Sequence, residues 1–166
     1  MLSETVDLAS VPAFMTGQTF EQMTPGSVFR TAARTVTEAD LVAFVTLAGL
    51  TEPLFLDASG SAAEGYAGRL VPGTLTLAYA EGLVMQTGVL HGTGMAFLGS
   101  SVDVRGPVFV GDTISVVVEV LDARPTRSGG RGIVTTRNTV VTSPGTVVLV
   151  YEPKRMIRGA SAPSGM

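Results

Sequence analysis

Cysteine and tryptophan are absent from this chain of 166 residues, and histidine occurs once. Without cysteine there is no disulfide, no thiolate metal ligand and no cysteine nucleophile, and a lack of disulfides suits a reducing cytoplasm. A single histidine also excludes a histidine-rich metal site. The net charge is −3 and no run of basic residues occurs, so nucleic acid and anionic membranes are not attracted electrostatically. We expect no metal, no other cofactor, no nucleic-acid partner and no membrane partner.

Long apolar runs are missing as well. No uninterrupted apolar stretch approaches the ~18 residues that a membrane-spanning helix needs. The first residues, MLSETVDLASVPAF, carry acidic rather than basic side chains, so we expect no signal peptide and a cytoplasmic protein. Hydrophobic residues nevertheless make up 45% of the chain, and few of them are aromatic. We expect one domain with a core of valine, leucine and alanine, because single domains commonly have roughly 100–200 residues.

The first half of the chain predicts one strand and two main helices. An alternating strand is expected at residues 27–36, although both of its faces mix polar and apolar side chains. Thr37 is a good N-cap for a helix that Gly49 ends, and a short helix is expected near Ala62 in the loop-rich connection that follows. The helix that opens at Gly73 is apolar nearly all round, which is typical of a helix buried in the middle of a fold.

The second half predicts strands almost throughout. Valine, isoleucine and threonine gather in segments that glycine- and proline-containing turns separate, at residues 95–104, 113–121, 133–142 and 147–151. A strand, a helix, a buried helix and four consecutive strands indicate an α+β fold, in which an antiparallel sheet wraps around a central helix. We expect this domain at residues 14–158, after an arm of residues 1–13 and before a flexible tail of residues 159–166.

Three segments of the chain follow one another in a characteristic order and spacing. They are AGLTEPLFLD at 48–57, GRLVPGTLTLAYAEGL at 68–83 and VDVRGPVFVGDT at 102–113. Together they resemble the MaoC-like family, the R-specific enoyl-CoA hydratases. The resemblance implies the hotdog fold and the hydration of a trans-2-enoyl thioester, or the reverse dehydration. It also implies that the ligand is an acyl-CoA or acyl-carrier-protein thioester, and that the chain forms a homodimer or pairs with another hotdog subunit.

The acid and base of that family are missing from the first segment. In the family an Asp and a His, five positions apart, move the protons of water. Leu50 and Phe55 stand at those positions here, and neither side chain can donate or accept a proton. The resemblance places an oxyanion donor at the amide of Gly73, although Pro-Gly is also ordinary at a helix start. The expected pocket residues are Leu50, Phe55, Tyr66 and Thr74. Acyl-thioester binding is therefore better supported than hydration.

Three further residues are candidates for the missing proton chemistry. Glu52 would act as a base if apolar neighbours raised its pKa, and would otherwise be a solvated loop acid. Asp57 is more typical of a helix cap, and His91 of a solvent-facing turn. We keep all three as catalytic candidates.

Tyrosines and arginines supply the remaining candidates. Tyr66 and Tyr79 would donate hydrogen bonds to a bound carbonyl, although Tyr79 is more typical of the core, with its hydroxyl on a backbone partner. Arginine side chains would bind the phosphates of coenzyme A, and the leading candidates are Arg105 and Arg131, followed by Arg127 and Arg137. Arginines scattered along strands and turns are, however, more often simply exposed on the surface.

Four functions remain open from the sequence. The first, which we favour, is a hydro-lyase-like enzyme of acyl thioesters, a hydratase, dehydratase or isomerase with rearranged catalytic residues. The second is a non-catalytic hotdog subunit that holds the acyl chain and pairs with an intact hydratase, which Leu50 and Phe55 would suit because they make the pocket apolar. The third, a tailoring enzyme of a polyketide-type pathway, is left open by the same pocket. The fourth, a hotdog thioesterase, ranks last because no carboxylate lies near Gly73.

Overall fold

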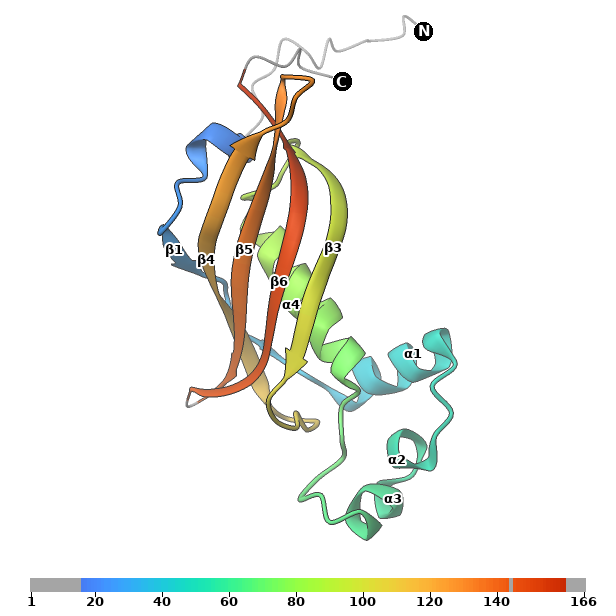
Figure 1. The fold of residues 1–166 in the computed structure, drawn as a ribbon. Coiled ribbons are helices and arrows are strands. Elements are labelled where there is room, and N and C mark those ends of the chain that lie inside the picture. Colours follow the sequence, from blue (N-terminus) through green and yellow to red (C-terminus); the bar gives the residue numbers. More distant parts are fainter. Residues whose placement is uncertain (1–15, 144, 161–166) are drawn as a thin grey trace, which may run out of the picture.

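The computed structural model describes residues 16–143 and 145–160. An antiparallel sheet curves around helix α4, which crosses one of its faces (Figure 1). This arrangement confirms the predicted α+β fold with a sheet wrapped around a central helix. The arm predicted at residues 1–13 and most of the predicted tail lie outside the described residues, and the domain boundaries stay predictions.

The sheet has six strands, in the order β1-β4-β5-β6-β3, with β2 also paired to β4. The strands are β1 (Val28–Arg30), β2 (Arg34–Thr35), β3 (Gly94–Val104), β4 (Thr113–Pro125), β5 (Arg131–Thr142) and β6 (Thr146–Arg158). Every neighbouring pair is antiparallel. The four long strands β3 to β6 confirm the four segments predicted in the second half of the chain.

Two strands depart most from the prediction, and β4 also runs to Pro125, four residues past its predicted end. The predicted first strand is interrupted between β1 and β2, where the hydroxyl of Thr31 accepts a hydrogen bond from the backbone of β4. Val28 is exposed and Val36 is fully buried, so these two residues do not share the face that simple alternation predicts. β6 runs past its predicted end through a charged segment, because Arg155 is buried there against Glu81 of α4.

The helix before the central one begins and ends as predicted. Helix α1 spans Glu38–Ala48. The Thr37 hydroxyl accepts a hydrogen bond from the Asp40 amide, and the Asp40 carboxylate in turn accepts one from the Thr37 amide at 2.9 Å. Hydrogen bonds from Thr37 and Tyr79 hold the pKa of the Asp40 carboxyl well below its usual range. Gly49 ends the helix with a φ of 67°, in the left-handed region where glycine is favoured.

Two short helices fill the connection to the central helix. Helix α2 spans Pro53–Leu56 and helix α3 spans Ala58–Ala63. Asp57 caps α3 by accepting a hydrogen bond from the Ser59 amide at 2.8 Å. The short helix predicted near Ala62 therefore exists, and a second one precedes it. Together with α1 these helices lie beyond the β3 edge of the sheet (Figure 1).

The central helix α4 spans Gly73–Gln86 and supplies one side of the core. Its buried residues are Leu75, Thr76, Ala80, Leu83 and Val84. The apolar ones pack in one cluster with buried side chains of β4 and β6, among them Ile114, Val116, Leu149 and Tyr151. Because the helix buries this face against the sheet, its N-terminal residue Gly73 is held at a fixed position. The predicted burial of this helix is confirmed.

One edge of the sheet has no strand partner among residues 16–143 and 145–160. Strand β3 pairs only with β6, and its other edge forms the border of the sheet in Figure 1. All of its residues except Gly99 are exposed, including the large apolar side chains Phe97, Leu98, Val102 and Val104. A long, apolar, unpaired edge strand is a surface that proteins normally cover.

No helix in the described part of the chain is long and apolar enough to cross a bilayer.

Candidate acyl-thioester site

A cavity of about 200 Å³ opens at the N-terminus of the central helix. Its lining residues are Phe55, Tyr66, Leu70, Val71, Gly73, Thr76, Val104, Gly106, Pro107, Val108, Val148 and Leu149. The walls come from the short-helix segment, from α4, from the end of β3 and from the start of β6. Three of the residues singled out in the sequence, Phe55, Tyr66 and Gly73, thus line one cavity.

The amide of Gly73 is a hydrogen-bond donor at this cavity. The first amides of a helix have no carbonyl one turn earlier with which to pair. Among the described residues no backbone carbonyl accepts from the amide of Gly73 or Thr74, whereas Leu75 already donates to the Pro72 carbonyl at 2.9 Å. A Cβ at Gly73 would lie 3.5 Å from a methyl group of Val104, an ordinary contact distance. The helix start can therefore offer an amide donor and the positive end of its dipole to a thioester oxygen.

The opposite wall of the cavity is fixed by Arg69. Its guanidinium donates hydrogen bonds to the carbonyl of Phe55 at 3.1 Å and to that of Leu56 at 3.4 Å. The same group forms an ion pair with Glu38 of α1 at 2.8 Å. Buried Ser61 adds a second tie, since its hydroxyl donates to the Leu54 carbonyl at 3.0 Å. Arg69 thereby joins α1, α2 and the segment that leads into α4.

Replacing Arg69 with alanine is expected to lower the free energy of unfolding by about 1–3 kcal/mol, because two carbonyls lose a charged donor. Urea denaturation measures this change. Arg137→Ala is the matched control: its ion pairs with Glu119 and Glu152 are exposed, so its loss should cost about 0–1 kcal/mol. Equal effects of the two substitutions would show that Arg69 does not secure this wall.

The cavity offers hydrogen-bond donors but few side chains that could transfer a proton. Among its lining residues the only titratable side chain is the phenol of Tyr66, whose ring makes an edge contact with Phe109 at 6.3 Å between centroids. The hydroxyl of Thr76 is turned to the Pro72 carbonyl at 3.4 Å. Leu50 does not line the cavity, and it packs half-buried against the main core. The cavity lining therefore offers an amide donor at Gly73, and no carboxylate or imidazole.

The acidic and imidazole candidates lie outside this cavity. Glu52 is exposed and holds the N-cap position of α2 through its backbone, and its side chain accepts no capping hydrogen bond. Asp57 is engaged with Ser59, whose hydrogen bonds lower the pKa of the Asp57 carboxyl. His91 is exposed in the turn before β3, where its carbonyl accepts from the amide of Gly17 at 2.8 Å. The structure does not bring these three side chains together.

The two leading phosphate candidates lie far apart within one protomer. Arg105 follows the end of β3, where Val104 is paired with Leu149, and its exposed side chain contacts Asp103. Arg131 begins β5 opposite Arg158, at the other end of β6. Only Arg105 is therefore near the Gly73 end of the fold. Arg127 is exposed in the turn after β4, and Arg137 is paired as described above.

Tyr79 differs from its predicted setting. The residue is half-buried, and its hydroxyl accepts a hydrogen bond from the Arg34 side chain at 3.1 Å instead of bonding a backbone group. The Arg34 guanidinium also stacks over the ring, 4.1 Å from its centroid. Burial and the neighbouring Asp40 raise the pKa of Tyr79 to about 12. The prediction of a backbone partner was wrong because Arg34 of β2, paired with Asp40 of α1, supplies a side-chain partner at this position.

Sequence reasoning missed several residues of the site. Arg69 stands inside the GRLVPG motif, but its role depends on carbonyls that lie far from it in the sequence. Val104 of β3, Pro107 of the turn after β3 and Val148 of β6 line the cavity. Their proximity to Gly73 results from strand pairing, which no local pattern encodes.

The fold is that of a hotdog domain, and the amide at the start of its central helix is a donor at the cavity. Residues 20–142 match the family model described as the MaoC like domain. The chain belongs to the family of MaoC-like domains.

Individual relatives agree with this assignment. An (R)-specific enoyl-CoA hydratase of Aeromonas caviae is 36% identical over 86 residues, which are 52% of this chain and 63% of that relative, so less than two thirds of its length is spanned. A monoamine oxidase regulatory protein of Archaeoglobus fulgidus is 29% identical, with a TM-score of 0.80 and coverage of 87% of this chain and 97% of that one.

A third relative shares the fold. A conserved hypothetical protein of Mycobacterium tuberculosis, described as having a double hotdog fold, is 24% identical with a TM-score of 0.77. The match covers 87% of this chain and 45% of that chain, so this chain corresponds in length to about half of it.

Proposed function

We propose that this chain binds an acyl thioester, of coenzyme A or of an acyl carrier protein, with the thioester oxygen on the Gly73 amide. The observation that carries the proposal is the free amide at the start of a buried helix, opening into an apolar cavity. Water addition requires one group to take a proton and another to deliver one. The cavity lining offers no carboxylate or imidazole for these steps, so we propose an atypical hydratase-like protein whose own lining binds the substrate without hydrating it.

The proposal includes a dimer in which β3 pairs with β3 of a second copy. The exposed apolar residues of β3 and its free edge support this pairing. The relative described as a double hotdog fold also supports it, because that description puts two such units in one chain. The second candidate function replaces one copy by a hotdog subunit with an intact acid and base, and the apolar Phe55 wall favours it.

Binding and hydration of crotonyl-CoA by the purified chain test this function. Isothermal titration calorimetry is expected to show binding of crotonyl-CoA, while absorbance at the enoyl-thioester band stays constant. Free coenzyme A is the control for contacts made outside the acyl group. An absence of binding would refute the proposal. Hydration by the chain alone would show that an acid or base outside the cavity lining takes part, and Glu52→Gln would test the nearest candidate.

A further inference from the structure

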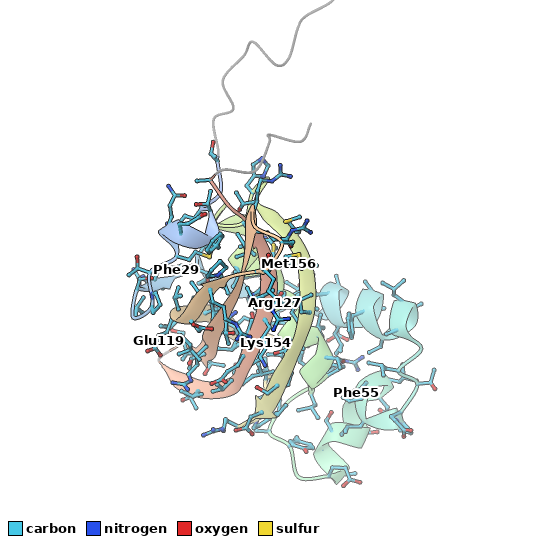
Figure 2. All side chains as sticks on the ribbon, turned by 45° about the horizontal axis from the view of Figure 1, so that its top comes forward. Phe29, Phe55, Glu119, Arg127, Lys154 and Met156 are labelled. Carbon is cyan, nitrogen blue, oxygen red and sulfur yellow. The ribbon has the colours of Figure 1, made fainter. Side chains whose placement is uncertain are left out.

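A second cavity, of about 260 Å³, lies at the other end of β3. Its lining residues are Glu81, Met85, Leu90, Gly94, Met95, Ala96, Phe97, Arg155 and Met156. Figure 2 shows Met156, in this cavity, well separated from Phe55 of the first cavity. Most of the lining is apolar and suits an alkyl chain. Its polar part is a single ion pair between Glu81 of α4 and Arg155 of β6.

This ion pair belongs to a buried polar cluster with unused hydrogen-bonding capacity. Arg155 is 6% exposed, and it donates to the Thr136 hydroxyl at 3.5 Å, which donates to Asn138 at 2.8 Å. Within the described residues the buried Nε of Arg155 donates no hydrogen bond, although the guanidinium lies in the cavity wall. Glu81 accepts from Arg155 through Oε1, and a carboxylate has room for further donors.

A plain alkyl chain against this wall would remove the pair from water without replacing its hydrogen bonds, which is unfavourable. A hydroxyl group can hydrogen-bond with both members of the ion pair, because it donates one hydrogen bond and accepts others. It can donate to the Glu81 carboxylate while its oxygen accepts from the Arg155 guanidinium. A carboxylate ligand would be repelled by the Glu81 charge, and a ketone could offer Glu81 no donor beyond Arg155.

The two cavities of one protomer are too far apart to hold one acyl chain. Ala96 and Val104 are eight residues apart on β3, which at ~3.3 Å per residue separates the cavities by roughly 26 Å. If β3 pairs antiparallel with its own copy about Gly99, the Gly94 end of one strand meets the Val104 end of the other. Neighbouring strands are only about 5 Å apart, so the second cavity of one copy then adjoins the first cavity of its partner.

We propose that the Glu81–Arg155 cavity is the distal part of the acyl site of the neighbouring copy, and that it binds a hydroxyl group on the acyl chain. The inference rests on the proposed acyl-thioester function and on the pairing of two copies. It names the substrate class: hydroxylated acyl thioesters of medium length, in preference to plain fatty acyl thioesters.

Calorimetry with two thioesters of equal heavy-atom number tests this inference. ω-Hydroxyoctanoyl-CoA is expected to bind the full chain about tenfold more tightly than nonanoyl-CoA. The hydroxyl of the first hydrogen-bonds with the Glu81–Arg155 pair, whereas the alkyl end of the second removes that pair from water without replacing its hydrogen bonds. In Glu81→Gln this preference should fall to about twofold or less, because the charged acceptor is gone. Equal binding of the two thioesters to the unsubstituted chain, or a preference that survives Glu81→Gln, would overturn the inference.

A second variant keeps the test decisive if Glu81→Gln does not fold. Met85 is 47% exposed and lines the cavity, so Met85→Trp should fill it and weaken both long thioesters while leaving butyryl-CoA unaffected. Leu47→Trp, at an 87% exposed position of α1, is the matched control and should change nothing. If Met85→Trp leaves the long thioesters unchanged, the inference fails. Butyryl-CoA separates the two proposals: its failure to bind the unsubstituted chain would refute both, and its binding would leave the proposed function standing.

Discussion

Hydration of crotonyl-CoA is expected to rise by about two orders of magnitude or more when Leu50→Asp and Phe55→His are combined. A positioned acid and base typically accelerate a reaction 10²–10⁴-fold. The chain already supplies the loop, the cavity and the Gly73 donor, so the two side chains are what it lacks. The initial rate of loss of enoyl-thioester absorbance measures the gain.

The single substitutions separate the contributions of the two positions. Phe55 lines the cavity, so Phe55→His alone should give a small gain in rate. Leu50 packs against the core, so an Asp there is partly desolvated, which raises its pKa and lowers the stability of the fold. The variant Leu50→Asn with Phe55→His is the matched control, of nearly the same shape but without the base. A double variant that folds, binds crotonyl-CoA and hydrates no faster than this control would show that the loop no longer presents the family geometry.

Gly73→Pro should weaken crotonyl-CoA binding about tenfold, because proline has no amide hydrogen to donate. The first position of a helix tolerates proline well, and Pro72 already has the extended conformation that a residue before proline needs, with φ −55° and ψ 137°. In the double variant with restored acid and base the same change should lower kcat by about 10²-fold, the usual loss for one oxyanion donor.

The control for this change is Gly73→Ala. Alanine keeps the amide and places its methyl group 3.5 Å from Val104, so binding should stay close to that of the unsubstituted chain. Circular dichroism and the melting temperature confirm that the helix is retained in both variants. If alanine and proline weaken binding equally, the effect is steric, and the amide is not the donor.

The fold was largely predictable because local rules and burial agree along most of the chain. Thr37 and Gly49 mark the ends of α1, and an almost wholly apolar helix indicated the central position of α4. Prediction failed where a long-range contact decides the outcome. Arg155 belongs to a strand because Glu81, on a distant helix, compensates its charge. Alternation across Thr31 likewise gave no sign that the first strand is interrupted.

The candidate site was predictable only in part. Gly73, Phe55 and Tyr66 could be singled out from motifs, and they line one cavity. The roles of Arg69 and Glu81 could not be inferred, because each acts on groups that only the folded chain brings near. Glu52 and Asp57 are close to Phe55 in the sequence, yet neither lines the cavity. Proximity in the sequence therefore does not place a side chain in the site.

The two walls of the Gly73 cavity differ in how firmly the fold constrains them. Helix α4 is anchored by buried side chains across the sheet, whereas the Phe55 wall is held by the partly buried Phe55 and by the hydrogen bonds of Arg69. Substitutions or insertions in the short-helix segment can therefore change the shape of the Gly73 cavity with little effect on the stability of the sheet. In a domain built this way, the acid and the base on the loop wall can be lost while the amide donor at the start of the central helix is retained.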